Sequence, residues 1–128
     1  MKLRIKGNSI RLRLTQNEIN EFKEKGIVIE VVKFGISSES QMHYIIQKTD
    51  KSEIYATFDS NKMMINVPNA IAEKWVLTNQ VGFENRMMIN DKEDLFILVE
   101  KDYKCLQPRD HEDESDMFPH PAEGTLKC

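Results

Sequence analysis

The chain has 128 residues, 40% of them hydrophobic and 30% charged, and its formal net charge is −3 at pH 7. These values are ordinary for a soluble globular protein and predict one domain that is long enough to bury a core. The basic N-terminus never reaches an apolar run of the length that a secretory signal or a membrane span needs, so we expect neither. We therefore expect a cytoplasmic protein with no membrane partner, in which cysteines serve as thiols or metal ligands in preference to a structural disulfide.

Residues 2–14 predict a tight hairpin, because Gly7-Asn8 suits a two-residue type II′ turn between two short strands. One face of this hairpin is apolar. The other face carries two pairs of like charges directly opposite each other: Arg4 with Arg11, and Lys2 with Arg13. Like charges in this arrangement repel, so we expect the face to be either well solvated or covered by an anion.

Two helices are predicted. Thr15 and Glu18 have the form of a capping box, so the first helix begins after Thr15, runs through Lys25 and stops at Gly26. Pro68 favours the first turn of a second helix that extends to about residue 77.

Strands fill most of the remaining chain. Residues 27–34, 41–48, 53–58 and 62–67 predict an antiparallel meander, and residues 81–90 another strand. Leu95 to Val99 is the densest apolar run and predicts a strand that is buried on both faces. The hexamers 61–66 and 85–90 resemble each other, which we interpret as two similar strands and not as a duplicated unit; their methionines would fill irregular core space.

The fold class that follows is α+β, with about seven mostly antiparallel strands, as a meander or an open barrel, and two short helices. From Gln107 onward the sequence is poor in apolar residues and rich in acids and prolines. We therefore divide the chain into an α+β domain, 1–106, and an irregular acidic C-terminal tail, 107–128, which packs on the domain or extends from it.

The cationic face of the hairpin is the first candidate site. Its anion-binding residues would be Lys2, Arg4, Arg11 and Arg13. Three interpretations of this face remain open. It is a solvated face that keeps an edge hairpin from aggregating, it is covered by the acids of residues 110–116, or it binds an external phosphorylated ligand or RNA. The hairpin has no aromatic residue on which a base could stack, which counts against RNA.

The second candidate site lies in the tail. Four potential metal ligands occur there with the spacing Cys-x5-His-x8-His-x7-Cys: Cys105, His111, His120 and Cys128. Two thiolates and two imidazoles would form a closed tetrahedral site for zinc, but no Cys-x2-Cys pair is present. A disulfide, a core cysteine at a strand end and a free terminal thiol use the same residues. The nearby acids lack the spacing of a calcium-binding EF-hand loop.

The sequence gives poor signals for an enzyme: there is no phosphate-binding glycine-rich loop, no Gly-x-Ser-x-Gly and no His-Glu-x-x-His. A Cys–His dyad that includes Cys105 remains open. The leading hypothesis is a non-enzymatic binding or adaptor module, in which the acidic tail shields the cationic hairpin until an anionic partner, such as a protein, a phosphorylated ligand or RNA, displaces it. The alternatives are a small metal-binding protein or thiol enzyme, and direct binding of RNA or phosphate by the hairpin.

Three stretches carry a resemblance to a known family: residues 2–15, residues 80–84 and the late Phe-Pro-His-Pro at 118–121. Together they resemble a family of small uncharacterised bacterial proteins, over nearly the whole chain. The resemblance implies a bacterial, cytoplasmic, single-domain protein and implies no activity, cofactor or catalytic residue.

Overall fold

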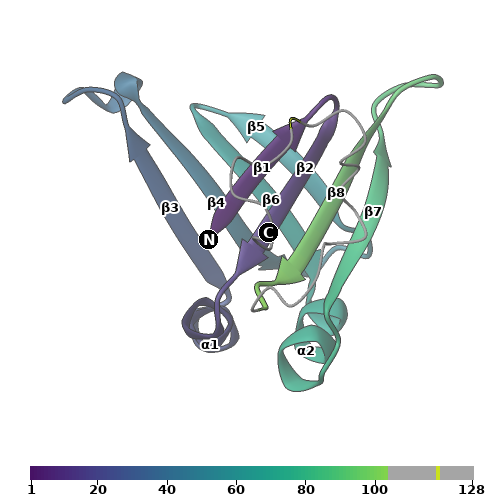
Figure 1. The fold of residues 1–128 in the computed structure, drawn as a ribbon. Helices are drawn as coiled ribbons and strands as arrows, with labels where there is room; N and C mark the ends of the chain where they lie inside the picture. Colours follow the sequence, from purple (N-terminus) through teal and green to yellow (C-terminus); the bar gives the residue numbers. More distant parts are fainter. Residues whose placement is uncertain (104–117, 119–128) are drawn as a thin grey trace.

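The structure is a computed structural model that describes residues 1–103 and residue 118 (Figure 1). The elements in chain order are β1 (Lys2–Lys6), β2 (Ser9–Leu14), α1 (Gln16–Lys25), β3 (Ile27–Lys33), a 3-10 turn (Ser38–Ser40), β4 (Gln41–Thr49), β5 (Tyr55–Asp59), β6 (Lys62–Pro68), α2 (Asn69–Leu77), β7 (Gly82–Met88) and β8 (Asp94–Lys101). The α+β class is confirmed, and the described residues form eight strands where about seven were expected. The predicted boundary at residue 106 lies outside the described residues.

The strands form two four-stranded sheets, in the orders β1-β2-β8-β7 and β3-β4-β6-β5. Four pairings are antiparallel, and the two central ones, β2 with β8 and β4 with β6, are parallel. The simple meander expected over residues 27–67 is therefore not formed, because β4 pairs with β6 and not with β5. Each sheet consists of two hairpins joined along a parallel seam.

Local sequence signals set the ends of these elements. Gly7 has φ +56° in the first turn, and β1 and β2 pair in the predicted register. The Thr15–Glu18 capping box is present, and Gly26 ends α1 with φ +73°. Glycine adopts this left-handed conformation without the steric cost that other residues bear.

The core lies between the sheets, and both helices cover the same end of it (Figure 1). Phe22 of α1 and Phe83 of β7 contact Trp75 of α2 edge to face, at ring-centroid distances of 6.0 and 5.0 Å. The indole N–H of Trp75 donates to the carbonyl of Val81 at 3.1 Å, so this buried polar atom is satisfied. The end of the sheets away from the helices has no such cover in the described part of the chain (Figure 1).

The two halves of the chain repeat one arrangement. β1-β2-α1-β3-β4 and β5-β6-α2-β7-β8 are both hairpin–helix–hairpin units, and each gives one hairpin to each sheet. The registers agree: Leu12 lies opposite Val99 in one parallel seam, and Ile65 lies opposite Ile46 in the other. The result is an approximate two-fold relation that exchanges the sheets.

The similarity between the two hexamers of the sequence does not arise from this structural repeat. Residues 61–66 lie mainly on β6 and residues 85–90 mainly on β7, and these strands are not equivalent under the two-fold relation. They are two similar strands, as interpreted. The true repeat pairs β6 with β2 and β7 with β3.

Side-chain and terminal contacts bridge the open edges between the sheets, where the described residues show no strand pairing. At one edge the Met1 ammonium contacts Glu18 and, at 3.0 Å, Glu30 of β3. At the equivalent edge the Asn85 amide donates to the carbonyl of Ile54 at 2.8 Å. The barrel is thus not closed, but contacts join the two sheets at both edges.

No helix in the described residues is long and apolar enough to cross a membrane.

Candidate functional site

The cationic hairpin face is partly neutralised from within the chain. β8 lies beside β2, and its Glu100 accepts a hydrogen bond from Arg11 Nε at 2.9 Å. Arg13 Nε lies 3.7 Å from the same carboxylate oxygen. Arg11 and Glu100 are each only 8% exposed. Because a buried charge needs a partner, these groups form a structural ion pair.

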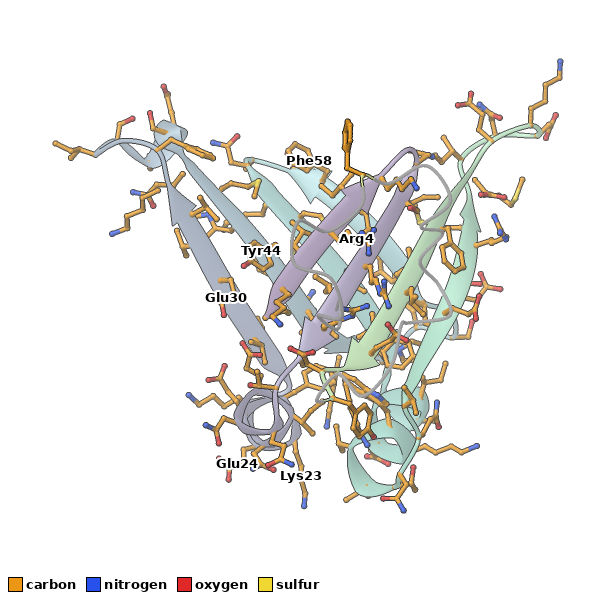
Figure 2. The ribbon with its side chains drawn as sticks, viewed as in Figure 1. Arg4, Lys23, Glu24, Glu30, Tyr44 and Phe58 are labelled. Atoms are coloured by element: carbon orange, nitrogen blue, oxygen red, sulfur yellow. The ribbon has the colours of Figure 1, made fainter. Side chains whose placement is uncertain are left out.

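The remaining hairpin cations extend this face. Lys2 Nζ lies 2.9 Å from Asp102, just after β8. Arg4 lies on β1 (Figure 2), and the register places it directly opposite Arg11. The acids at 110–116, which were expected to cover the face, lie outside the described residues. Glu100 and Asp102 were missed because the sequence does not show that β8 pairs with β2.

The predicted metal ligands cannot be placed on the fold. Cys105, His111, His120 and Cys128 all lie outside the described residues. Within residues 1–103 and 118, no group of three histidine, cysteine, aspartate or glutamate side chains is arranged to hold a metal. The zinc site and the Cys–His dyad stay predictions.

A cavity of about 330 Å³ lies between the two sheets, on the side of the molecule away from the helices. One wall comes from β1, β2, β7 and β8, and the other from β4, β5 and β6. The side chains that alternate toward the sheet interface make these walls apolar. The first wall contributes Leu3, Ile5, Ile10, Met87 and Leu95, and the second contributes Met42, Ala56, Phe58 and Met63.

Equivalent residues of the two repeats face each other across this cavity. The registers relate Leu3 to Ala56, Ile5 to Phe58, Ile10 to Met63 and Met42 to Leu95. All eight line the cavity, so the cavity lies on the two-fold relation that exchanges the sheets. It is a product of the whole architecture and not of one loop.

The mouth of the cavity exposes large apolar side chains. Ile5 is 64% exposed and Phe58 is 71% exposed, and Figure 2 shows Phe58 at the open end of its sheet. Both belong to strands of the cavity wall. Apolar side chains exposed around a cavity are typical of a surface that receives a ligand.

Two of the polar side chains at the cavity, Asn8 and Ser9, are already bonded to the backbone. The Asn8 amide donates to the Asp94 carbonyl at 2.7 Å, and the Ser9 hydroxyl donates to the Lys6 carbonyl at 2.6 Å. No charged residue is among the described residues that line the cavity. Among the described lining residues, none is an acid or a base that would activate the hydroxyl of Ser9 or Thr57.

A titratable cluster ties the edge of the cavity wall. Burial alone would lower the pKa of the Met1 ammonium, but the hydrogen bonds and charges of Glu18 and Glu30 outweigh it and raise the pKa above 8.0. Burial alone would raise the pKa of Glu18, yet its bonds to Met1 and Thr15 lower the pKa below 4.5. Burial raises the pKa of Tyr44, as do the charges of Glu30 and Glu18, and its hydroxyl donates to the Met1 carbonyl at 2.9 Å.

A family model matches residues 1–122. The chain belongs to a family of unknown function, DUF7009. No curated protein and no solved structure matches the chain. The DUF7009 match agrees with the resemblance to uncharacterised proteins and adds no activity, so the function has to be argued from the geometry.

Sequence reasoning missed the cavity. It assigned the methionines to irregular core space, and Met63 is indeed 6% exposed, but Met63 and Met87 also line an unfilled volume. Strand alternation could have placed these side chains on the inner faces. The distance between the sheets, which creates the cavity, has no sequence signal.

Proposed function

We propose that this DUF7009 protein is a non-enzymatic binding module that holds a small molecule in the cavity between its two sheets. The observation that carries the proposal is the apolar cavity of about 330 Å³ itself. The cavity opens to solvent at one side, and a concave site with mostly apolar walls is the usual form of a small-molecule site. Ligand pockets occupy roughly 300–1,000 Å³, which places this cavity at the small end of that range.

Two further features support a binding role at this place. Ile5 and Phe58 expose apolar surface at the mouth, where a ligand would enter. Met1 contacts Glu30 at one edge between the sheets and Asn85 contacts Ile54 at the other, so contacts outside the cavity join its two walls. A preformed site binds with less loss of conformational freedom.

The hairpin is a weaker place for an anionic partner. Such a partner would have to displace Glu100 from Arg11 and Asp102 from Lys2. Removing Glu100 from a pair that is mostly buried is costly. The adaptor hypothesis with an anionic partner stays secondary for this reason. The zinc and thiol hypotheses stay secondary because Cys105, His111, His120 and Cys128 lie outside the described part of the chain.

The chain offers a matched pair of variants for the test. Ala56 lies in the cavity wall at the place where the other repeat has Leu3, so Ala56→Leu fills the cavity with a side chain that the fold already accommodates in the equivalent position. Ala70 is exposed on α2, so Ala70→Leu is the same change away from the cavity.

We expect the neutral fluorescent probe N-phenyl-1-naphthylamine to bind the full chain with one site. Ala56→Leu should weaken this binding at least about tenfold, because the added methylenes occupy the volume that the probe needs. Ala70→Leu should leave it unchanged. Equal binding by Ala56→Leu and the unaltered chain, with both folded by circular dichroism, would rule the proposal out.

A further inference from the structure

The charge and shape of the cavity narrow the class of ligand, if the binding function proposed above holds. We propose that the natural ligand enters the cavity with an uncharged, apolar part, about the size of an eight-carbon chain or a two-ring aromatic. The assignment comes from four properties of the cavity: its volume, its lack of charged lining residues, the backbone bonds of Asn8 and Ser9, and its flexible methionines.

A charged ligand group would find no partner inside. The described lining residues carry no charge, and their polar side chains are the amide of Asn8 and the hydroxyls of Ser9 and Thr57. The Asn8 amide and the Ser9 hydroxyl already donate to backbone carbonyls. An ion that leaves water needs an opposite charge or several hydrogen bonds in return. A hydroxyl group loses little hydration free energy when the apolar side chains at the mouth displace part of its water, whereas a carboxylate or an ammonium group loses much more.

The volume of the cavity limits the size of the ligand part that it can hold. An engineered apolar cavity of about 150 Å³ stays dry and accepts benzene, and this cavity has about twice that volume. One benzene-sized molecule would leave half of it empty. A chain of about eight carbons or a pair of fused rings fills it better, and filling an apolar void restores the dispersion contacts that its wall lacks.

Three methionines give the wall its adaptability. Met42, Met63 and Met87 line the cavity from three different strands. Unbranched thioether side chains adjust to ligands of different shape and contact aromatic rings favourably. The ligand is therefore recognised as an apolar class and not through a fixed pattern of hydrogen bonds.

Two other methionines of the chain serve as controls for binding between the sheets. Met64 and Met88 directly follow Met63 and Met87 along their strands, so they point to the opposite faces of the sheets. Met64 lies beside Ile45 and Thr57 in the register, and Met88 is 61% exposed. A ligand between the sheets contacts one methionine of each pair and not its neighbour.

The test uses the full chain labelled with 13C at the methionine methyl groups, with each signal assigned by a single Met→Leu variant. It is titrated at neutral pH with three probes of equal chain length: 1-octanol, octanoate and octylammonium. We expect 1-octanol to shift the signals of Met42, Met63 and Met87 and to leave those of Met64 and Met88 in place. Octanoate and octylammonium should bind at least about tenfold more weakly, because of the cost of burying charge.

The outcomes separate this inference from the proposed function. If either charged probe shifts the same three methionines with an affinity like that of 1-octanol, the cavity binds ligands but the assignment to uncharged ligands is wrong. If no probe shifts them, both this inference and the binding function fail. If 1-octanol shifts Met64 or Met88 instead, the ligand site is not between the sheets, and both again fail.

Discussion

At the scale of single residues, equivalent positions in the two parallel strand pairs are joined by different chemical groups. In one parallel seam Gln47 lies opposite Asn66, and their amides bond at 2.7 Å. The equivalent position in the other seam pairs Arg13 with Glu100, and Arg11 adds a second cation. A neutral pair and a charged cluster thus occupy equivalent places. In the charged cluster, the Glu100 carboxylate is the group that both arginines share.

We predict that Glu100→Gln destabilises the protein by about 3 kcal/mol, because Arg11 keeps its charge in a buried place without its carboxylate. The free energy of unfolding in urea measures this. The control is Asp94→Asn, which breaks the pair with Arg86 at 3.3 Å, where Arg86 is 67% exposed. That exposed pair should contribute less than about 1 kcal/mol. Equal losses in the two variants would contradict a structural role for Glu100.

At the scale of elements, the edge between β1 and β3 depends on charge. The Met1 ammonium has a raised pKa, so its contribution is complete below pH 8.0 and is lost as the pH rises through the pKa of the folded state. Glu18 has a lowered pKa, so its contribution is complete above pH 4.5 and is lost as the pH falls through the pKa of the folded state. The tie is therefore strongest between these limits.

We predict that the difference in unfolding free energy between the unaltered chain and Glu18→Gln is largest between about pH 5 and pH 8 and shrinks on both sides. Urea unfolding across the pH range measures it. Glu24→Gln, an exposed change on the same helix (Figure 2), should give a small difference that does not peak in this window. A flat profile for Glu18→Gln would show that the ammonium tie contributes nothing.

Elements governed by near neighbours were predictable from the sequence. The Gly7 turn, the Thr15 capping box and the Gly26 stop depend on contacts within a few residues, and all three are as predicted. Strand pairing across the chain was not predictable. Nothing near Arg11 in the sequence points to Glu100, because the parallel pairing of β2 with β8 joins the two ends of the described fold.

At the scale of the whole molecule, the repeat was hidden because equivalent places carry different residues. Phe22 corresponds to Trp75, and Arg11 to Met64, by the register of the strands and the placement of the helices. The succession of elements carries the signal instead: a short hairpin, a helix of about three turns and a second hairpin occur twice. The order of the predicted strands and helices therefore indicates the duplication, although the residues at equivalent positions do not.

The cavity is a property of the whole molecule, because residues of both sheets and both repeats form its walls. The binding function rests on its being an open apolar space in the folded protein, and its lining of equivalent pairs is the physical basis of that claim. Sequence alone predicts which side chains face inward, but it does not predict how far apart the sheets stand.

Crystals of the full chain under xenon pressure test this most directly, since xenon enters preformed apolar cavities. We predict an anomalous xenon peak between the sheets, in contact with Ile10 and Met63, and a weaker peak or none there in Ala56→Leu. Ile5 and Phe58 folded into the space, with no xenon between the sheets, would contradict the account.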